Sequence, residues 1–281
     1  MKTAATIVNK VRGAATSDGA GVKLTRIIGQ PQLKNLDPFL MLDEFGSNNA
    51  DDYIAGFPSH PHRGFQTVTY MLEGKMRHRD SEGNDGLIES GGIQWMNAGK
   101  GIIHEEMPEQ TEGVMRGFQL WVNLPSSHKL SKPDYQDIPA REVPTIVIDE
   151  SLKIKLLSGE LENTTGPVTS IDGSIPTPFF ADFSVLKEVT HTQYLNKSYQ
   201  YFLYVYEGQL AIGIDYVKQG ELVVLSKSDE LEVVAQPDAR WILVGGKPIN
   251  EPIVQYGPFV MNTPDEIEQA LKDYQNGVLT R

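Results

Sequence analysis

The sequence contains no cysteine, which excludes disulfide bonds, thiolate metal ligands and a cysteine nucleophile. It also lacks an excess of positive charge, because 25 Lys and Arg residues stand against 37 Asp and Glu residues and the net charge at pH 7 is −12. Nucleic-acid binding depends on clustered Lys and Arg, so we expect no direct binding of nucleic acid. No stretch is apolar over the length needed to cross a bilayer, and residues 1–6 contain no long apolar run typical of a secretory signal. These absences favour a protein of the cytoplasm.

Turn-forming residues and short β-rich runs dominate what the chain does contain. The 26 glycines and 17 prolines are spread along the sequence between segments rich in β-branched and aromatic residues. Many short strands with turn signals between them are typical of β-sandwiches and barrels, so we expect an all-β fold. The clearest strand segments are 67–72, 117–122, 145–148, 201–206, 222–225 and 241–244.

One short helix is expected near the end of the chain. Thr263 can cap it, Pro264 suits the first helical position, and Glu266 stands three residues after the cap. Asn276-Gly277 provides a stop signal. The apolar face between these signals consists of Ile267, Ala270, Leu271 and Tyr274.

A weak internal repeat indicates two related barrels. Residues 70–75 (YMLEGK) resemble residues 204–209 (YVYEGQ), since each is an apolar strand that runs into a Glu-Gly turn. A looser likeness connects residues 91–95 with the region 228–231. Beyond residue 130 the only histidine is His191, so we expect no metal site in the second copy.

These features predict two domains. Residues 1–130 would form a metal-binding domain, and residues 131–281 a second domain without a metal site that ends in the helix. The stretch 125–144, rich in Pro, Ser and charge, is the expected connector out of the first barrel. The polar stretch 159–173 is an expected surface loop.

Two short pairs with the same spacing stand out in the first half: His60-Pro61-His62 and His104-Glu105-Glu106. Residues i and i+2 of a strand point to the same face, so each pair can aim at one point. If the two strands lie side by side, all four side chains converge. Three imidazoles and one carboxylate suit a divalent transition metal such as Fe, Mn, Ni, Co, Cu or Zn. The alternative is that the histidine pairs lie on surface loops.

Several further residues have a structural interpretation that we favour over a functional one. Pro61 cannot donate to a β-ladder, which places its neighbours at a strand start or edge. Gly99-Lys100-Gly101 lacks the spacing of a phosphate loop and is better explained as a tight turn before His104. His78 and His128 have charged or polar neighbours, so we expect both to be exposed. Sheet packing is the preferred role of Tyr199, Tyr201, Tyr204 and Tyr206.

At this point the chain resembles a known family, the pirins, which are two-domain cupins. The resemblance spans nearly the whole chain and is densest over residues 36–125. It implies two tandem cupin barrels of the jelly-roll type, with a mononuclear iron site in the N-terminal barrel. Carried over by position, the metal ligands would be His60, His62, His104 and Glu106. The matching segments are LDPFLMLDEF (36–45), GFPSHPHRGF (56–65), QWMNAGKGIIHEEMP (94–108), QLWVNLP (119–125) and GPFVMNT (257–263).

The resemblance also implies two alternative functions. Pirins are described as quercetin 2,3-dioxygenase-like enzymes and as regulators that bind other proteins. As an enzyme, the chain would bind one Fe(II) and cleave quercetin-like flavonols with O₂, with Glu106 as the catalytic base that removes the hydroxyl proton. As a regulator, it would bind a protein partner in a metal- and redox-dependent way without turnover. A cupin isomerase is a weaker alternative, because nothing points to a sugar phosphate.

Two residues depart from the family pattern. Gln66 stands where relatives often carry Glu, and Gly92 stands where many have Asp. Neither is one of the four ligands, so the metal prediction is unaffected, although Gln66 could change the charge of the pocket. Because one chain already pairs two domains, we expect a monomer.

Overall fold

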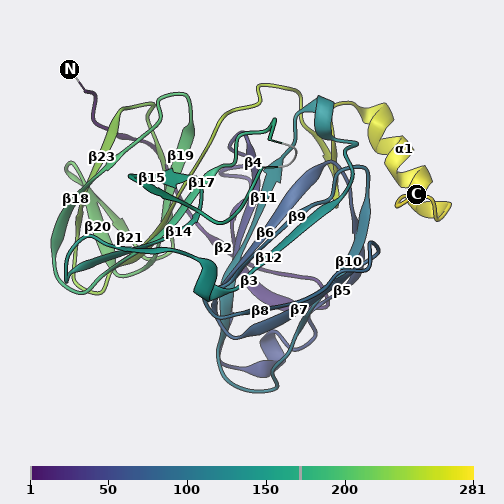
Figure 1. Ribbon diagram of the computed structural model, residues 1–281, viewed down its shortest axis with the longest axis horizontal. Helices are drawn as coiled ribbons and strands as arrows, with labels where there is room; N and C mark the ends of the chain where they lie inside the picture. Colours follow the sequence, from purple (N-terminus) through teal and green to yellow (C-terminus); the bar gives the residue numbers. More distant parts are fainter. Residues whose placement is uncertain (1, 171–172) are drawn as a thin grey trace. The chain divides into compact units, whose positions relative to one another are not determined.

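The computed structural model describes residues 2–170 and 173–281 and consists mainly of β-strands (Figure 1). It divides into two compact units. We call Ala14–Arg141 with Ile249–Arg281 the histidine barrel, and the residues up to Gly13 with Glu142–Pro248 the apolar barrel. Each contains one seven-stranded and one four-stranded antiparallel sheet, which confirms the predicted all-β fold with two barrels.

The histidine barrel has the strand orders β12-β9-β6-β11-β4-β3-β2 and β5-β10-β7-β8. A ribbon of β25 and β26 and the helix α1 complete it. The elements are β2 (Ala14–Asp18), β3 (Val22–Ile28), β4 (Phe39–Ser47), β5 (Phe57–His62), β6 (Phe65–Glu73), β7 (Lys75–Asp80), β8 (Asp85–Glu89), β9 (Ile93–Asn97), β10 (Ile102–Pro108), β11 (Met115–Asn123), β12 (Asp134–Ile138), β25 (Val254–Tyr256), β26 (Phe259–Met261) and α1 (Pro264–Gln275), with 3-10 turns at Ala50–Asp52 and Ser126–His128.

The apolar barrel repeats this plan with the orders β1-β22-β19-β24-β17-β14-β13 and β18-β23-β20-β21. A small hairpin of β15 and β16 is added to it. The elements are β1 (Ile7–Arg12), β13 (Thr145–Val147), β14 (Leu152–Ser158), β15 (Glu160–Leu161), β16 (Thr164–Thr165), β17 (Phe179–Val185), β18 (Val189–Tyr194), β19 (Gln200–Glu207), β20 (Gln209–Ile212), β21 (Asp215–Lys218), β22 (Glu221–Leu225), β23 (Glu230–Ala235) and β24 (Arg240–Gly246).

The predicted internal repeat is present in the strand order. Residues 70–75 run from β6 into β7 and residues 204–209 from β19 into β20, and these strands hold equivalent places in the two barrels. Both turns need a positive φ, which glycine supplies at Gly74 (99°) and Gly208 (68°). The looser likeness was wrong, because the counterpart of β9 is β22, which ends before residues 228–231.

The compact units differ from the predicted halves 1–130 and 131–281. Strand β1 pairs with β22, so the first residues belong to the apolar barrel. The last 33 residues, with β25, β26 and α1, belong to the histidine barrel. Both assignments depend on pairing between segments some 200 residues apart, which no local sequence pattern reveals. Residues 125–144, the predicted connector, contain the border between the units but also the strand β12. The predicted surface loop 159–173 contains the hairpin β15–β16. Two of its positions, 171 and 172, lie outside the described residues.

The helix α1 is confirmed with its predicted ends. Thr263 accepts from the backbone N–H of Glu266, and the Glu266 carboxylate accepts from the backbone N–H of Thr263, which completes a capping box. The helix packs through Ile267 and Ala270 onto the ribbon β25–β26 and onto β10 at Ile103. Within the described part of the chain, no helix is both long and apolar enough to cross a membrane.

Arg63, directly after β5, ties that strand to the C-terminal segment. Its guanidinium donates to Oδ2 of Asp273 on α1 at 2.7 Å, to the carbonyl of Leu279 at 3.3 Å and to the carbonyl of Lys100. The Arg63 side chain is 8% exposed and that of Asp273 22%. The helix therefore stabilises the end of β5 where His62 stands.

Lys129 holds the same turn from the other side. Its side chain is buried among neutral acceptors, and burial lowers the pKa of its ammonium group to about 8. The three N–H donors of the ammonium are matched by three oxygens at 2.8–2.9 Å, which belong to Gly64, Asn123 and Val260.

We predict that Asp273→Asn lowers the free energy of unfolding at pH 7 by about 1 kcal/mol, because it weakens the partly buried ion pair. The Arg63 guanidinium lowers the pKa of the Asp273 carboxyl. A carboxyl whose folded pKa lies below its unfolded value stabilises the fold above roughly pH 4 and loses this contribution as the pH falls. The deficit of Asp273→Asn should therefore shrink below pH 4 in urea unfolding. Glu268→Gln, which removes an exposed pair with Lys272, is the control and should change little. Equal stability of Asp273→Asn and the wild type at pH 7 would contradict this role.

Candidate metal centre

The two strands that carry the predicted ligands lie side by side. In the register of the antiparallel pair, His104 of β10 is opposite His60 of β5, and Ile102 is opposite His62. Strand β5 is the edge of its sheet, as the proline between its histidines predicted. Along β10 His104 and Glu106 are buried and alternate with the more exposed Glu105. The predicted i, i+2 geometry is therefore present on both strands.

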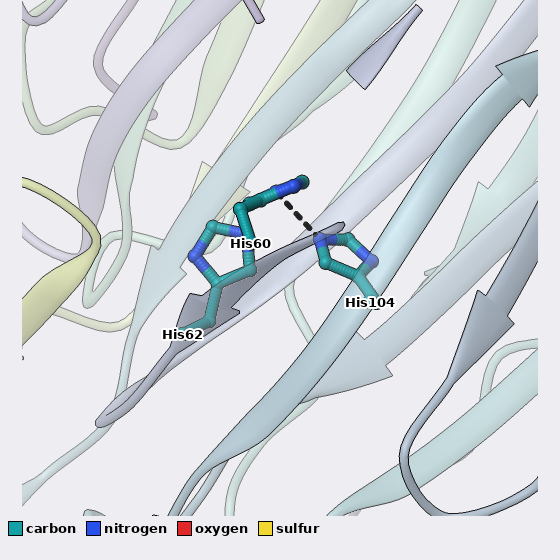
Figure 2. A group of neighbouring side chains, drawn as sticks. All are labelled: His60, His62 and His104. Carbon is teal, nitrogen blue, oxygen red and sulfur yellow. Dashed lines mark hydrogen bonds between the residues drawn. The ribbon is translucent and has the colours of Figure 1, made fainter. Parts of the chain in front are cut away.

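Three imidazoles meet inside the histidine barrel (Figure 2). The ring nitrogens of His60, His62 and His104 that could bind an ion lie within 4.8 Å of one another. Nε2 of His60 is 2.9 Å from Nε2 of His104. Two nitrogens bound in adjacent positions of an octahedral ion at about 2.1 Å would stand roughly 3.0 Å apart, so this spacing fits a shared cation.

The hydrogen bonds at the three rings also fit a metal ion. Nδ1 of His60 is 2.8 Å from the carbonyl oxygen of Pro58, which can only accept, so Nδ1 donates and the neutral ring keeps its lone pair on Nε2. Neither buried ring nitrogen of His62 has a hydrogen-bond partner among the described residues. Buried polar atoms without partners are rare, and a bound cation accounts for the nitrogen that carries the lone pair, while the other nitrogen carries the proton and lies toward the backbone of Pro258.

Burial keeps two of the rings neutral. It lowers the pKa of His62 well below its usual value, and the neighbouring His60 acts in the same direction. Burial likewise lowers the pKa of His104, assisted by His62 and His60. A neutral imidazole is the form that binds metal, so these rings are ready to act as ligands at neutral pH.

Glu106 is oriented by two donors instead of lying within the compact group of three rings. Its Oε1 accepts from Oγ1 of Thr69 at 2.9 Å and its Oε2 from Nε2 of Gln119 at 2.8 Å. Nε1 of Trp121 donates to Oε1 of Gln119 at 3.3 Å and so fixes the amide. Each carboxylate oxygen has two acceptor positions, so one remains on each for a proton or an ion. The structure thus brings three of the four predicted ligands together and positions the fourth by other contacts.

Sequence reasoning missed His78. It was expected to be exposed, but its side chain is fully buried beside His104. The signal was present in β7, where the sequence KMRHRD alternates, with Lys75, Arg77 and Arg79 more exposed and Met76 and His78 buried. Reading that period of two would have placed His78 inside the barrel. His128, by contrast, is partly exposed.

A cavity of about 830 Å³ opens next to the imidazoles. His60, His62 and Gln119 line it together with apolar and aromatic side chains. Arg26 also faces it, but Asp43 and Asp18 bind this guanidinium at 2.7–2.9 Å, so its charge is largely compensated. The large apolar and aromatic side chains of the lining are Leu24, Met41, Phe45, Phe57 and Trp121. A cavity of this size with such a lining suits a small organic molecule.

Gln66, which departs from the family pattern, is buried in β6 opposite Asn97 and Val122. Among the described residues it does not line the cavity, so it offers no direct contact through which to change the charge there.

In the apolar barrel, hydrophobic side chains stand at most of the positions equivalent to the four predicted metal ligands. The turns at Gly74 and Gly208 align β7 with β20, and strand pairing then aligns β10 with β23 and β5 with β18. Leu231 and Val233, at the positions of His104 and Glu106, are buried in one apolar core. In chain order, the counterparts of the four predicted ligands are Gln193, Leu195, Leu231 and Val233.

The four tyrosines for which sheet packing was predicted divide into two pairs. Tyr204 and Tyr206 are buried in β19, in agreement with the predicted packing role. Tyr199 and Tyr201 instead line a cavity of about 470 Å³, so the packing role accounts for only part of their surroundings.

Comparison with known proteins agrees with both barrels. Residues 21–122 match the Pirin family model, and residues 180–280 match the Pirin C-terminal cupin domain. A Pseudomonas aeruginosa protein named "Putative quercetin 2,3-dioxygenase" is 49% identical over 271 residues, which are 95% of each chain. A pirin-like protein of Caulobacter vibrioides is 46% identical over 96% of this chain and 98% of its own.

Among solved structures, the crystal structure of quercetin 2,3-dioxygenase from Acinetobacter baumannii superposes with a TM-score of 0.90, at 32% identity and 98% coverage of both chains. The two barrels are therefore cupin domains, and the three histidines form a group that can bind a metal ion. By sequence and by fold, the chain belongs to the pirin family.

Proposed function

We propose that the histidine barrel binds one Fe(II) ion through His60, His62 and His104, with Glu106 as the fourth ligand, and that the apolar barrel binds none. The observation behind this proposal is the 2.9 Å approach of two ring nitrogens beside a third ring whose nitrogens lack partners. Nitrogen and oxygen donors also suit Mn, Ni, Co, Cu and Zn, and iron is the ion that the family resemblance implies.

We further propose that the protein is a monomeric cytoplasmic dioxygenase that cleaves quercetin-like flavonols with O₂. The names of the relatives from Pseudomonas and Acinetobacter support this substrate class. So does the aromatic lining of the cavity, since Phe45, Phe57 and Trp121 can contact the faces or edges of a flat polyphenol.

In this mechanism the bound metal supplies a Lewis acid and coordination positions for oxygen ligands. Glu106 would remove the proton of the flavonol hydroxyl; its carboxylate is buried directly behind Gln119, which lines the cavity. Thr69 and Gln119 keep that carboxylate in one orientation before the substrate arrives, which lowers the cost of organising the base. The apolar walls exclude water from the deprotonated substrate.

The alternative, a metal-dependent regulator that binds a protein, makes a different prediction. Its net charge of −12 would suit a basic partner. A regulator has no need to consume a flavonol, so turnover separates the two functions.

We predict that His62→Ala weakens metal binding by roughly 100-fold or more, because it removes one of three neutral nitrogen donors. The measurement is titration of metal-free protein with Ni²⁺ in competition with a chromophoric chelator. His128→Ala, which changes a partly exposed histidine, is the control and should leave the affinity unchanged. Wild-type affinity in His62→Ala would remove this residue from the ligand set.

We also predict that Glu106→Gln lowers flavonol turnover by about 100-fold or more, as expected for loss of a general base. The iron-loaded protein is incubated with quercetin and O₂ while the flavonol absorbance is followed, and bound iron is measured in parallel. Glu105→Gln is the matched control, since that side chain points away and contacts Arg79. Full activity of Glu106→Gln would exclude the base role. If the wild type consumed no flavonol with any divalent metal, the regulatory alternative would be favoured.

A further inference from the structure

A buried His-Asp pair lies behind the three imidazoles and has no part in the mechanism above. The side chains of His78 and Asp80 in β7 are both fully buried. Nε2 of His78 is 3.0 Å from Oδ2 of Asp80, and Nδ1 of His78 is 3.3 Å from Nδ1 of His104. The three groups therefore form a chain of hydrogen bonds that leads to one of the rings of the metal centre.

The surroundings of Asp80 set the direction of this chain. Its Oδ1 accepts from the backbone N–H groups of Glu82 and Asn84 at 2.9 and 3.0 Å, and its Oδ2 accepts from Nδ2 of Asn84 at 2.8 Å. Both oxygens of Asp80 thus already act as acceptors of N–H groups, and Oδ2 acts in the same way toward His78. Nε2 of His78 must therefore be the donor in its contact with Asp80.

The donor and acceptor roles at His104 follow from those at His78. A neutral His78 that donates through Nε2 carries a lone pair on Nδ1. Nδ1 of His104 must donate to that lone pair, so the lone pair of His104 is on Nε2. This is the atom that lies 2.9 Å from Nε2 of His60. The same lone-pair position follows for His60 from its contact with the Pro58 carbonyl, so two lone pairs face the same point.

Packing also fixes the ring of His78. Tyr135 of β12 stacks on it, with ring centroids 4.7 Å apart and an angle of 28° between the planes. The Tyr135 hydroxyl accepts from Nε2 of Gln94 at 2.7 Å, which holds the tyrosine in place. In the apolar barrel, the counterpart of His78 is the buried Ile212, and Leu231 stands at the position of His104.

We propose that Asp80 and His78 are positioning residues that fix the tautomer and orientation of His104, so that Nε2 is the atom presented to a metal ion. The proposal rests on the proposed function in one respect, that His104 is a metal ligand. The negative charge of Asp80 also makes the His104 ring a better electron donor through His78, as carboxylate partners do for ligating histidines in general.

The sharpest test is Asp80→Asn, because the structure determines how the amide must lie. The backbone N–H groups of Glu82 and Asn84 select the amide oxygen at the Oδ1 position, which places the NH₂ group against Nε2 of His78 and against the side chain of Asn84, whose amide turns round so that its oxygen accepts. Each hydrogen bond between Asp80, His78 and His104 would then run in the opposite direction. His78 would donate through Nδ1, and the proton of His104 would lie on Nε2. His104 would lose the lone pair that faces His60.

The measurement is a long-range ¹H–¹⁵N correlation spectrum of metal-free protein labelled with ¹⁵N-histidine. The chain has six histidines, so each ring can be assigned by substitution. We expect His104 in the Nδ1–H form in the wild type and in the Nε2–H form in Asp80→Asn. Ni²⁺ affinity, measured by chelator competition, should fall by about 10- to 100-fold in the variant.

Two further variants make the result decisive. Asp85→Asn removes one negative charge from the same hairpin without contact to His78, so it should keep both the wild-type tautomers and the wild-type affinity. His78→Phe keeps a ring against Tyr135 but removes the acceptor, so His104 should show both tautomers even if Asp80→Asn does not fold.

Two outcomes would overturn the proposal. One is the Nδ1–H form of His104 in every folded variant, and the other is a loss of affinity with no change of tautomer, which would indicate a merely structural role. If the wild type showed the expected tautomers but bound no metal, the proposed function would fail while the hydrogen-bond chain would stand, because the spectrum is recorded without metal.

Discussion

The pairing of β5 with β10 is the contact on which the rest of the site depends. A register with His60 opposite His104 places two ring nitrogens 2.9 Å apart inside a barrel, with His62 beside them. A shift by one residue would turn the whole set toward the other face of the sheet. The turn after β5 is accordingly held by two basic side chains. Arg63 connects it to the C-terminal helix, and the Lys129 ammonium group donates hydrogen bonds to the oxygens around it.

Burial of so many polar groups is costly unless each has a partner, and this requirement explains the organisation around the rings. Glu106 has Thr69 and Gln119, and His78 has Asp80. The ring nitrogens of His62 lack a hydrogen bond of ordinary geometry, and a cation would satisfy the one that carries the lone pair. The apolar barrel shows the other solution to the same topology: with Leu231 and Val233 at the equivalent positions, side chains fill the interior as a continuous apolar core. One strand order therefore supports both a polar site and a packed core.

The sequence predicted those parts that depend on local spacing. The i, i+2 pairs on β5 and β10, the edge position of β5 and both ends of α1 follow from the period of a strand and from capping chemistry. The donors to Glu106 could not be predicted, because Thr69 and Gln119 reach it through the register of β6 and β11. The domain borders were missed for a similar reason, since β1 pairs with β22 far along the chain. His78 was a different error: its charged neighbours suggested exposure, whereas the alternation along β7 indicated burial.

The central claim is that three imidazoles and one carboxylate of the histidine barrel surround a single cation. X-ray absorption spectroscopy of the iron-loaded protein tests it most directly, because imidazole rings give characteristic outer-shell scattering. The account predicts a first shell of nitrogen and oxygen atoms at about 2.0–2.2 Å with the scattering of three imidazoles. A spectrum of iron surrounded by oxygen alone, without imidazole scattering, would contradict it.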